Sequence, residues 1–419
     1  MNFTQATEGR AVIIHHLPSF LQPFFRPIQS NLSAAQFPHL WSLVLALAIN
    51  LKAAKLLHLS ALAPCSGHRT RNGAFLSHGH WDAPALLDQS AMNLLAGMKP
   101  RAGEVIHLIL DDTRIAKRGR KMSCISTIWD HKQQRFVRGH MVLLAAILFR
   151  GVVLPWRIDL WKPKGHRGPK YRKLTEMAAQ MIRDFTAPAG VKVRVLFDAF
   201  YLCPTVAKAC VSKGFTFFSV AQRNRNFTTA NGKRRKIAKL MPGLIRHQGR
   251  NIRMKRRRGH AKLRIAAADG HLSRIGKVRL IVSKRPRGPW KKTIAIVTSE
   301  TGLRPRQVVA IYEMRWLIEV LLKELHQDLG LSDYQMLHRD GILRHLHLVC
   351  LAHLLLTHRE LEALGAKATK ANKQVPMPVM SQRLAGLRAA VAKDRIKELI
   401  RGKEHVKLRQ NLCQLLAAA

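Results

Sequence analysis

Apolar residues recur at three- and four-residue intervals in two stretches of the first hundred residues, 40–59 and 83–98. This spacing is typical of amphipathic helices. Prolines, which interrupt helices, bound the stretches at Pro38, Pro64 and Pro100. We therefore expect an all-α domain over residues 1–100. The pattern supports a helix-turn-helix DNA-binding domain and a helical packing module equally.

After residue 100 the pattern changes to short apolar runs, which indicate strands, interspersed with helical spacing. The expected strands are 105–110, 123–129, 141–154 (one or two strands), 191–197 and 215–220. The expected helices are 173–185 and 204–213. Strands in a run, followed by alternating helices and strands, indicate a mixed α/β domain with a partly parallel sheet.

The next eighty residues, 221–300, combine strand-like runs with basic residues. The runs are 262–268, 277–284 and 293–298. Because residues 231–260 hold 12 Lys and Arg and no acid, we expect a β-rich insertion with a basic loop. Helical patterns and a polar linker follow: helix 306–328, helix 342–363, linker 366–380 and helix 381–401.

The balance of charge indicates the kind of partner that this protein binds. The 419 residues include 72 Lys and Arg against 24 Asp and Glu, a formal charge of +48, while 47% are hydrophobic. The apolar content is sufficient for a folded core, so a folded protein must offset this charge with a polyanion, and nucleic acid is the expected partner. This composition argues against most metabolic enzymes.

The cysteines and the apolar stretches indicate a compartment. Six scattered cysteines include no Cys-x-x-Cys pair, so neither a zinc site nor a disulfide framework is expected. No apolar stretch has the length of a membrane-spanning helix, and the first residues lack the pattern of a secretory signal. We expect a cytoplasmic protein of a reducing compartment.

Carboxylates stand out in a chain so poor in acids. Asp111 and Asp112 follow the apolar run 105–110, and Asp198 follows 191–197. Acids at strand ends face the crevice where α/β sheets bind ligands, and carboxylates with phosphate oxygens suit Mg²⁺. For each acid alone, a turn or a helix cap is the simpler interpretation. Together, in a polyanion-binding protein, they favour a metal site.

The helix expected at 306–328 supplies a further acid. Five residues recur at spacings of three and four, which places them along one helical face: Tyr312, Arg315, Glu319, Lys323 and His326. An exposed face with ordinary ion pairs is the simpler explanation. It does not account for cationic and aromatic residues on both sides of a single acid, which suit a phosphodiester backbone beside a metal ligand.

These residues resemble a known family. The chain is similar to DDE-type transposases of bacterial insertion sequences, in the group with a Tyr-x2-Arg-x3-Glu-x6-Lys signature, over roughly residues 100–350. The match comprises Tyr312, Arg315 and Glu319, with His326 in place of the Lys. Also similar are the Asp-Asp-Thr at 111–113 with basic residues behind it (Lys117, Arg118, Lys121), the Phe-Asp198-Ala-Phe-Tyr201 segment and the segment 329–335. Lys323 is expected to replace the missing Lys.

The resemblance implies an α/β fold: a ribonuclease H-like mixed sheet core (residues 101–220 and 301–365) with a β-rich insertion (221–300). It is flanked by the all-α N-terminal domain and a helical C-terminal segment (366–419). Asp111, Asp198 and Glu319 would be the catalytic residues and would bind two Mg²⁺ ions, with Mn²⁺ as a substitute. Strand alternation leaves Asp111 and Asp112 as alternatives for the first position, and the resemblance favours Asp111.

The resemblance also implies a function. Such an enzyme cleaves the ends of an insertion sequence and joins them to target DNA by two-metal-ion phosphoryl transfer. Its partners would be double-stranded DNA, namely terminal inverted repeats and target, and a second copy of the chain on paired ends, in a nucleoid-associated complex.

Basic and aromatic residues of the insertion are further DNA-binding candidates. The backbone contacts are expected from Arg234, Arg235, Arg256 and Arg257. Trp290 either stabilises a flipped base, as in some relatives, or is an ordinary core or interface residue. The alternative functions are a ribonuclease H-like nuclease without strand transfer and a transposase-derived DNA-binding protein that has lost catalysis.

Overall fold

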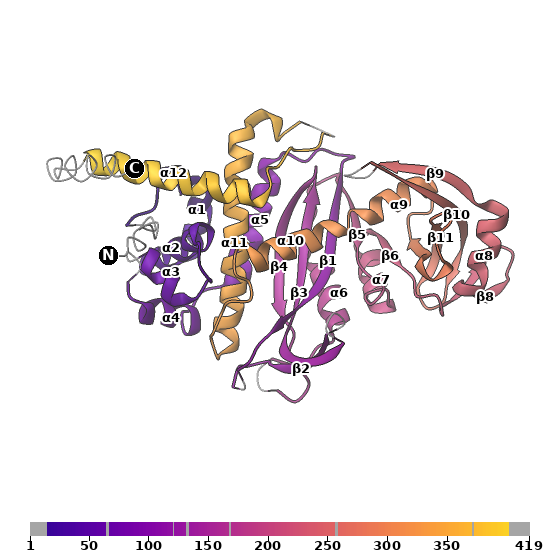
Figure 1. Ribbon diagram of the computed structural model, residues 1–419, viewed down its shortest axis with the longest axis horizontal. Helices are drawn as coiled ribbons and strands as arrows, with labels where there is room; N and C mark the ends of the chain where they lie inside the picture. Colours follow the sequence, from indigo (N-terminus) through magenta and orange to yellow (C-terminus); the bar gives the residue numbers. More distant parts are fainter. Residues whose placement is uncertain are drawn as a thin grey trace, which may run out of the picture. The chain divides into compact units, whose positions relative to one another are not determined.

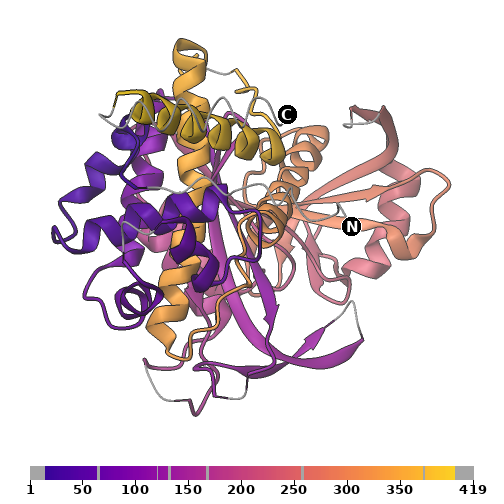
Figure 2. The ribbon, with the colours of Figure 1, turned by 60° about the vertical axis from the view of Figure 1, so that its left-hand side comes forward.

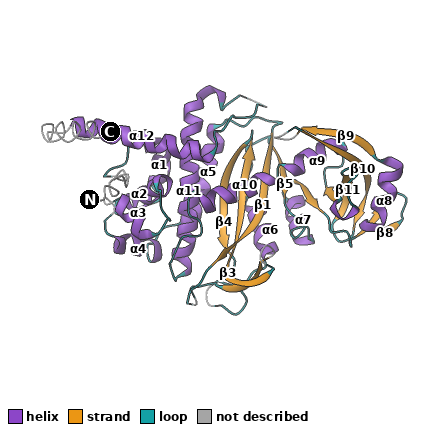
Figure 3. Cartoon of the chain, in the orientation of Figure 1, coloured by secondary structure: helices purple, strands orange, loops and turns teal. Residues whose placement is uncertain are grey.

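A computed structural model describes residues 15–63, 67–119, 121–130, 134–166, 169–255, 259–370 and 373–401. The chain divides into two compact units. One comprises residues 91–323 and 366–375 and contains the sheet. The other, which is helical, comprises residues 1–90, 324–365 and 376–419. Figures 1 and 3 show the elements of each.

A twelve-stranded sheet organises the first unit. Its first strands are β1 (Val105–Ala116), β2 (Ser126–Asp130), β3 (Arg135–Phe149), β4 (Val152–Leu160), β5 (Lys192–Leu196) and β6 (Thr216–Val220). In space they run β4-β3-β1-β5-β6, with β2 also paired to β3. β1, β5 and β6 are parallel, while β3 is antiparallel to its neighbours. This mixed sheet is consistent with the expected ribonuclease H-like core.

Two helices provide the crossover connections that parallel strands require. Helix α6 (Leu174–Asp184) connects β4 to β5, and α7 (Pro204–Ser212) connects β5 to β6. They pack on one another, α6 also contacts β3, and α7 contacts β6. The sequence-predicted strands and helices of this region are therefore present, and 141–154 forms parts of two strands.

The predicted insertion continues the same sheet. Its elements are β7 (Asn226–Thr229), β8 (Arg234–Lys236), α8 (Ile237–Gln248), β9 (Arg250–Lys255), β10 (His260–Leu272), β11 (Gly276–Lys284), η3 (Trp290–Lys292) and β12 (Ile294–Thr298). β12 pairs with β6 of the core, and the order continues through β11, β10, β7 and β8. The domain boundaries themselves stay predictions.

The basic segment 231–260 is not the loop that we expected, because α8 occupies its centre. Ile237, Met241 and Ile245 recur every fourth residue and are all buried, so an apolar stripe holds the helix against the sheet. The surrounding positive charge concealed this short stripe in the sequence.

Helix 306–328 was also expected as one element but forms two, α9 (Pro305–Glu313) and α10 (Trp316–Gln327). The amides of Met314 and Arg315 bond the carbonyls three residues back, at 3.0 Å each, so a tight turn replaces α-helical bonding there. The five signature positions therefore do not share one uninterrupted helical face.

The helical unit holds η1 (Ser19–Leu21), α1 (Gln22–Gln29), α2 (Gln36–Ile49), α3 (Leu56–Leu62), α4 (Arg69–Ser77), α11 (Arg339–Leu364) and α12 (Met380–Arg401). The short helix η4 (Gly365–Lys367) begins in this unit and ends in the other, whereas α10 begins in the other unit and ends in this one. Helix α5 (Ala83–Gly97) begins in this unit and ends in the other. The predicted helix 40–59 is interrupted between α2 and α3. Every residue from Leu40 to Ile49 is buried, and α2 packs against α11, so α2 is a core helix rather than a DNA-recognition helix.

The part of the chain that the structure describes contains no helix long and apolar enough to cross a membrane.

Candidate active site

Asp111 lies within β1 and not at its end, as the sequence had suggested, because β1 continues to Ala116. The pairing of β1 with β5 does end nearby, at Ile109 opposite Leu196. β3 remains paired to β1 throughout this part. Asp111 therefore lies two residues beyond the parallel pairing of β1 with β5, where the α/β rule predicts that ligands bind.

Asp198 follows the end of the neighbouring strand. It lies two residues past Leu196, the last residue of β5, just as Asp111 lies two past Ile109, the partner of Leu196. The charge of Asp198 raises the pKa of both Asp111 and Asp112, so its carboxylate lies close to these two acids. Asp198 Oδ1 accepts hydrogen bonds from the amides of Phe200 (2.9 Å) and Tyr201 (3.3 Å). Asp198 therefore also stabilises a turn, which was the simpler interpretation of this residue from the sequence.

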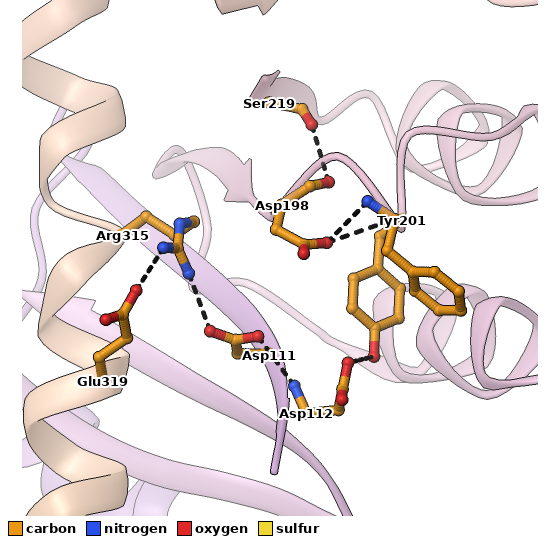
Figure 4. A network of polar contacts seen from close by, with 8 residues as sticks. Asp111, Asp112, Asp198, Tyr201, Ser219, Arg315 and Glu319 are labelled. Atoms are coloured by element: carbon orange, nitrogen blue, oxygen red, sulfur yellow. Dashed lines mark hydrogen bonds and ion pairs between the residues drawn. The ribbon is translucent and has the colours of Figure 1, made fainter. Parts of the chain in front are cut away.

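Arg315 connects the first and third predicted acids (Figure 4). Its Nη1 donates to Asp111 Oδ2 at 2.8 Å, and its Nη2 donates to Glu319 Oε1. Arg315 and Asp111 are each about 16% exposed and Glu319 32%, so these are partly desolvated ion pairs. The guanidinium lies between two carboxylates that were expected to share metal ions.

The helix break at Met314 and Arg315 has a consequence for Glu319. It places Glu319 in the first turn of α10, where the positive end of the helix dipole stabilises a carboxylate. It also frees Arg315 from the helix so that its side chain reaches β1. Tyr312, the preceding signature residue, is partly buried, which raises its pKa, while the charge and hydrogen bond of Arg315 lower it.

Asp112 points to the opposite face from Asp111, and its partner is Tyr201, whose hydroxyl donates to Asp112 Oδ1 at 2.8 Å. Burial and the charge of Asp112 raise the pKa of this phenol, so it remains a donor. Tyr201 appeared in the family-like segment, but its role was missed. The one sequence signal for this contact was a tyrosine, a residue that is often buried with its hydroxyl hydrogen-bonded, three positions after Asp198. Ser219 was missed too; its hydroxyl donates to the Asp198 carbonyl at 2.9 Å.

The site concentrates negative charge. Burial raises the pKa of Asp111 to about 7; Arg315 opposes this shift, and the charges of Asp112 and Asp198 add to it. Burial also raises the pKa of Asp112, against the hydrogen bond from Tyr201. Three carboxylates that repel one another in a partly buried position are suited to a cation.

The donor set fits Mg²⁺ chemically, since its ligands would be carboxylate oxygens. Among the described residues, however, no three His, Cys, Asp or Glu side chains form a group that could hold a metal ion. Arg315 bonds both Asp111 and Glu319, so an ion held by both acids would have to displace it.

The remaining signature residues differ in exposure. Lys323 is exposed, one turn after Glu319. His326 is partly buried; burial lowers its pKa, although Asp333 opposes this shift. A neutral imidazole is a weak phosphate ligand, so the expectation that Lys323 replaces the absent lysine stays reasonable.

The other predicted DNA-binding residues lie on the surface of the sheet unit. Arg118, Lys121, Arg234 and Arg235 are exposed, and Lys117 is partly so. Arg256 and Arg257 lie outside the described residues. Trp290 is 45% exposed, with the Lys284 ammonium 5.2 Å from its ring centroid, so it is not a core residue as the simpler interpretation had it.

A mixed sheet with an acid on one parallel strand, another just after the neighbouring strand and a third on a following helix is consistent with a ribonuclease H-like domain. Comparison places the chain in a family: residues 105–355, more than half of its length, match the family described as "Transposase DDE domain". The chain belongs to this family.

The chain is also similar to the "Probable transposase for insertion sequence element IS701" of Microchaete diplosiphon. The two are 24% identical over 277 residues, which cover 64% of this chain and 69% of that protein. The resemblance to DDE-type insertion-sequence transposases is thereby confirmed, and family membership supports a DNA transposase in general.

Proposed function

We propose that the protein cleaves the ends of an insertion sequence and joins them to target DNA by metal-dependent phosphoryl transfer, with Asp111, Asp198 and Glu319 as its catalytic residues. The observation that carries this proposal is that Asp111 and Asp198 each lie two residues past the last paired residues of two parallel strands, with Arg315 linking Asp111 to Glu319.

Each residue would have a distinct part in the reaction. Asp111 and Asp198 supply oxygen ligands from one face of the sheet, and Glu319 supplies one from α10. Tyr201 holds Asp112 on the opposite face, which leaves Asp111 as the ligand. Arg315, once released from the acids, carries its charge to a DNA phosphate, with which a guanidinium forms strong paired hydrogen bonds.

Two Mg²⁺ ions held by these acids would lower the pKa of an attacking water or 3′-hydroxyl and stabilise the leaving 3′-oxygen. Mn²⁺ has similar ligand preferences. The buried, mutually repelling carboxylates support a divalent cofactor, because added positive charge relieves the repulsion that raises the pKa of Asp111.

The proposed partners are double-stranded DNA, comprising the terminal inverted repeats and the target, and a second copy of the chain on paired ends. The relative described as a probable insertion-sequence transposase supports the choice of element. The formal charge of +48 supports binding of DNA within the nucleoid of a bacterial cytoplasm.

The test is a strand-transfer assay with DNA carrying the inverted repeats that flank the gene, a supercoiled target and Mg²⁺. Asp198→Ala and Glu319→Ala should abolish cleavage and joining while retaining DNA binding. Asp184→Ala is a matched control, since Asp184 is an exposed acid at the end of α6. It should retain full activity.

Other results would support the alternatives. Cleavage without joining by the unmodified chain would indicate a ribonuclease H-like nuclease. Binding without cleavage, in any divalent metal, would indicate a DNA-binding protein that has lost catalysis. Cleavage that survives in Asp198→Ala would refute the assignment of the site.

A further inference from the structure

The distal part of the sheet carries a cluster of basic and aromatic side chains that the proposed reaction does not use. β3 pairs with β1 on one side and β2 on the other, with Arg138 opposite Thr127 and Phe136 opposite Trp129. The amide of Lys117, just after β1, bonds the Arg138 carbonyl at 2.9 Å. Paired residues share a face, so we define these five residues as the hairpin face.

The hairpin face is exposed. Phe136 is 67% exposed, Thr127 and Arg138 are exposed, and Trp129 and Lys117 are partly so. The rings of Trp129 and Phe136 meet edge to face, with centroids 5.0 Å apart. The neighbours Ile128 and Val137 point the other way and are more buried. The aromatic rings are thus more exposed than the neighbouring aliphatic side chains, although large apolar side chains are ordinarily buried.

The charge of this part of the chain is positive. Arg118 and Lys121 are exposed close by in the sequence, and neither they nor Arg138 form an ion pair with any carboxylate among the described residues. Exposed aromatic rings interleaved with basic side chains are the combination that binds nucleic acid, through stacking or sugar contacts and phosphate contacts respectively.

The hairpin face lies on the same face of the sheet as the candidate site. Asp111, Thr113, Ile115 and Lys117 are alternate residues, and the register of β1 with β3 is unbroken from His107 to Ala116. Figures 1 and 2 show β1 and β3 continuing past the core to β2 at the lower edge of each view. Ile115 and His140 lie between Asp111 and the hairpin face and are buried, and His140 Nε2 bonds the Ser123 carbonyl. A duplex that spans Asp111 and the hairpin face would therefore pass over the segment around Ser123.

The distance fits duplex geometry. Six residues separate Asp111 from Lys117, which is roughly 20 Å at a strand rise of about 3.3 Å per residue. B-DNA rises about 3.4 Å per base pair, so roughly 20 Å corresponds to about six base pairs. Contacts at this distance would orient the duplex without touching the phosphate that is cut.

We propose that the hairpin face is a second DNA-binding surface, which holds the duplex about six base pairs from the phosphate at Asp111. Lys117 and Arg138 contact phosphates, and Phe136 and Trp129 pack on sugars or bases. The proposal rests on the proposed function only for the position of the cut. DNA binding itself can be measured without cleavage.

The first test measures binding of the full-length protein to a fluorescein-labelled 30-base-pair duplex of random sequence across a range of salt concentrations. Arg138→Ala should reduce the slope of log K against log[salt] by about 0.9, as expected for one lost phosphate contact. Phe136→Ala should weaken binding by about ten-fold without changing the slope, because no charge is removed. The β2–β3 hairpin should stay folded in both variants, because neither substitution removes a backbone hydrogen bond between the two strands.

Arg135→Ala is the matched control. Arg135 is an exposed arginine beside Phe136, and strand alternation directs it to the opposite face. Its loss should leave the affinity and the slope near those of the wild type. Equal effects of Arg135→Ala and Arg138→Ala would overturn the proposal in favour of diffuse electrostatic attraction.

The second test locates the contact. Phe136 lies two residues farther from Asp111 along the sheet than Arg138, so replacing it with p-benzoylphenylalanine should give a photo-cross-link to the duplex about eight base pairs from the metal-dependent cut. No cross-link, or a cross-link only to a second protein chain, would overturn the proposal. If the cross-link forms but the protein cuts no DNA in any metal, the proposed function fails and the DNA-binding surface stands. If Asp198→Ala abolishes cutting but the hairpin variants bind normally, only the surface is refuted.

Discussion

Arg315 donates one hydrogen bond to Asp111, 204 residues earlier in the chain, and a second to Glu319, four residues later. One guanidinium thus pairs with two acids that the family resemblance assigns to metal binding. A divalent cation bound by both acids would have to compete with Arg315.

Replacing Arg315 should reverse this competition. In Arg315→Gln, the partly buried acids lose their counter-charge, and we expect a loss of about 2–4 kcal/mol of unfolding free energy without metal. Millimolar Mn²⁺ should then raise the melting temperature more in the variant than in the wild type, because the ion no longer displaces an ion pair. Thermal unfolding with EDTA and with Mn²⁺ measures both effects.

Arg194→Gln provides the control for Arg315→Gln. Arg194 forms a two-bond ion pair with Glu300 at 2.7 and 2.8 Å and is as little exposed as Arg315, 16%. It should lose stability to a similar degree, yet gain nothing extra from Mn²⁺. An identical Mn²⁺ response in the two variants would contradict a direct role for Arg315.

Asp111 and Asp112 should differ in their importance for cleavage. Asp111→Asn removes a proposed metal ligand and should reduce cleavage by at least a thousand-fold, on the order of 4 kcal/mol. Asp112→Asn keeps a carbonyl oxygen for the Tyr201 hydroxyl, so it should retain fold and most activity. Nicking of end-containing DNA under single-turnover conditions distinguishes them. The opposite ranking would show that Asp112 is the ligand.

Stability should fall on moderate acidification because His140 is fully buried. Burial lowers its pKa from 6.5 to about 4, although the bond to the Ser123 carbonyl opposes this shift. Between these pH values the unfolded imidazole binds a proton that the folded one does not, so the unfolding free energy decreases as pH falls, by at most about 1.4 kcal/mol per pH unit.

Urea unfolding of His140→Gln should give a flatter pH dependence over that window. His247→Gln removes an exposed imidazole from α8 and should follow the wild-type curve. His107, whose pKa burial also lowers to about 4, should still contribute a similar slope in both variants. An unchanged slope in His140→Gln would mean that the imidazole is protonated in the folded state.

The exposed arginines of β8 should bind DNA without regard to sequence. Replacing both Arg234 and Arg235 with Ala should weaken binding to every duplex by a similar factor and reduce the salt slope by about 1.8, or 0.9 for each contact. Fluorescence anisotropy with a terminal-repeat duplex and a shuffled one measures this. Weaker binding to only one of the two duplexes would instead indicate base recognition.

Much of the sheet could be predicted from local pattern, because buried strands such as β5 and β12 are short runs of β-branched and other apolar residues. Helix α8 could not, since three apolar residues among many cations give a weak stripe. The break before α10 could not either. No proline or glycine lies between residues 311 and 320, and the break accompanies the pairing of Arg315 with Asp111, a tertiary contact that no local pattern contains.

The acids of the site were predictable as a set but not in their arrangement. Strand patterns located Asp111 and Asp198, yet the level register of the two depends on which strands pair, and the chain distance between them carries no such information. The hydrogen-bond partners of the two neighbouring acids, Arg315 for Asp111 and Tyr201 for Asp112, are also tertiary contacts that the sequence does not reveal.

The pairing of β12 with β6 also bears on where the proposed enzyme would cut DNA. Val297 lies opposite Ser219, and the Ser219 hydroxyl bonds the carbonyl of Asp198. A duplex bound by the insertion would therefore be positioned relative to Asp198 by the register of paired strands and not by the length of a loop. Lengthening the turns between the outer strands should leave the cleavage position unchanged, whereas a register slip of β12 along β6 would displace it.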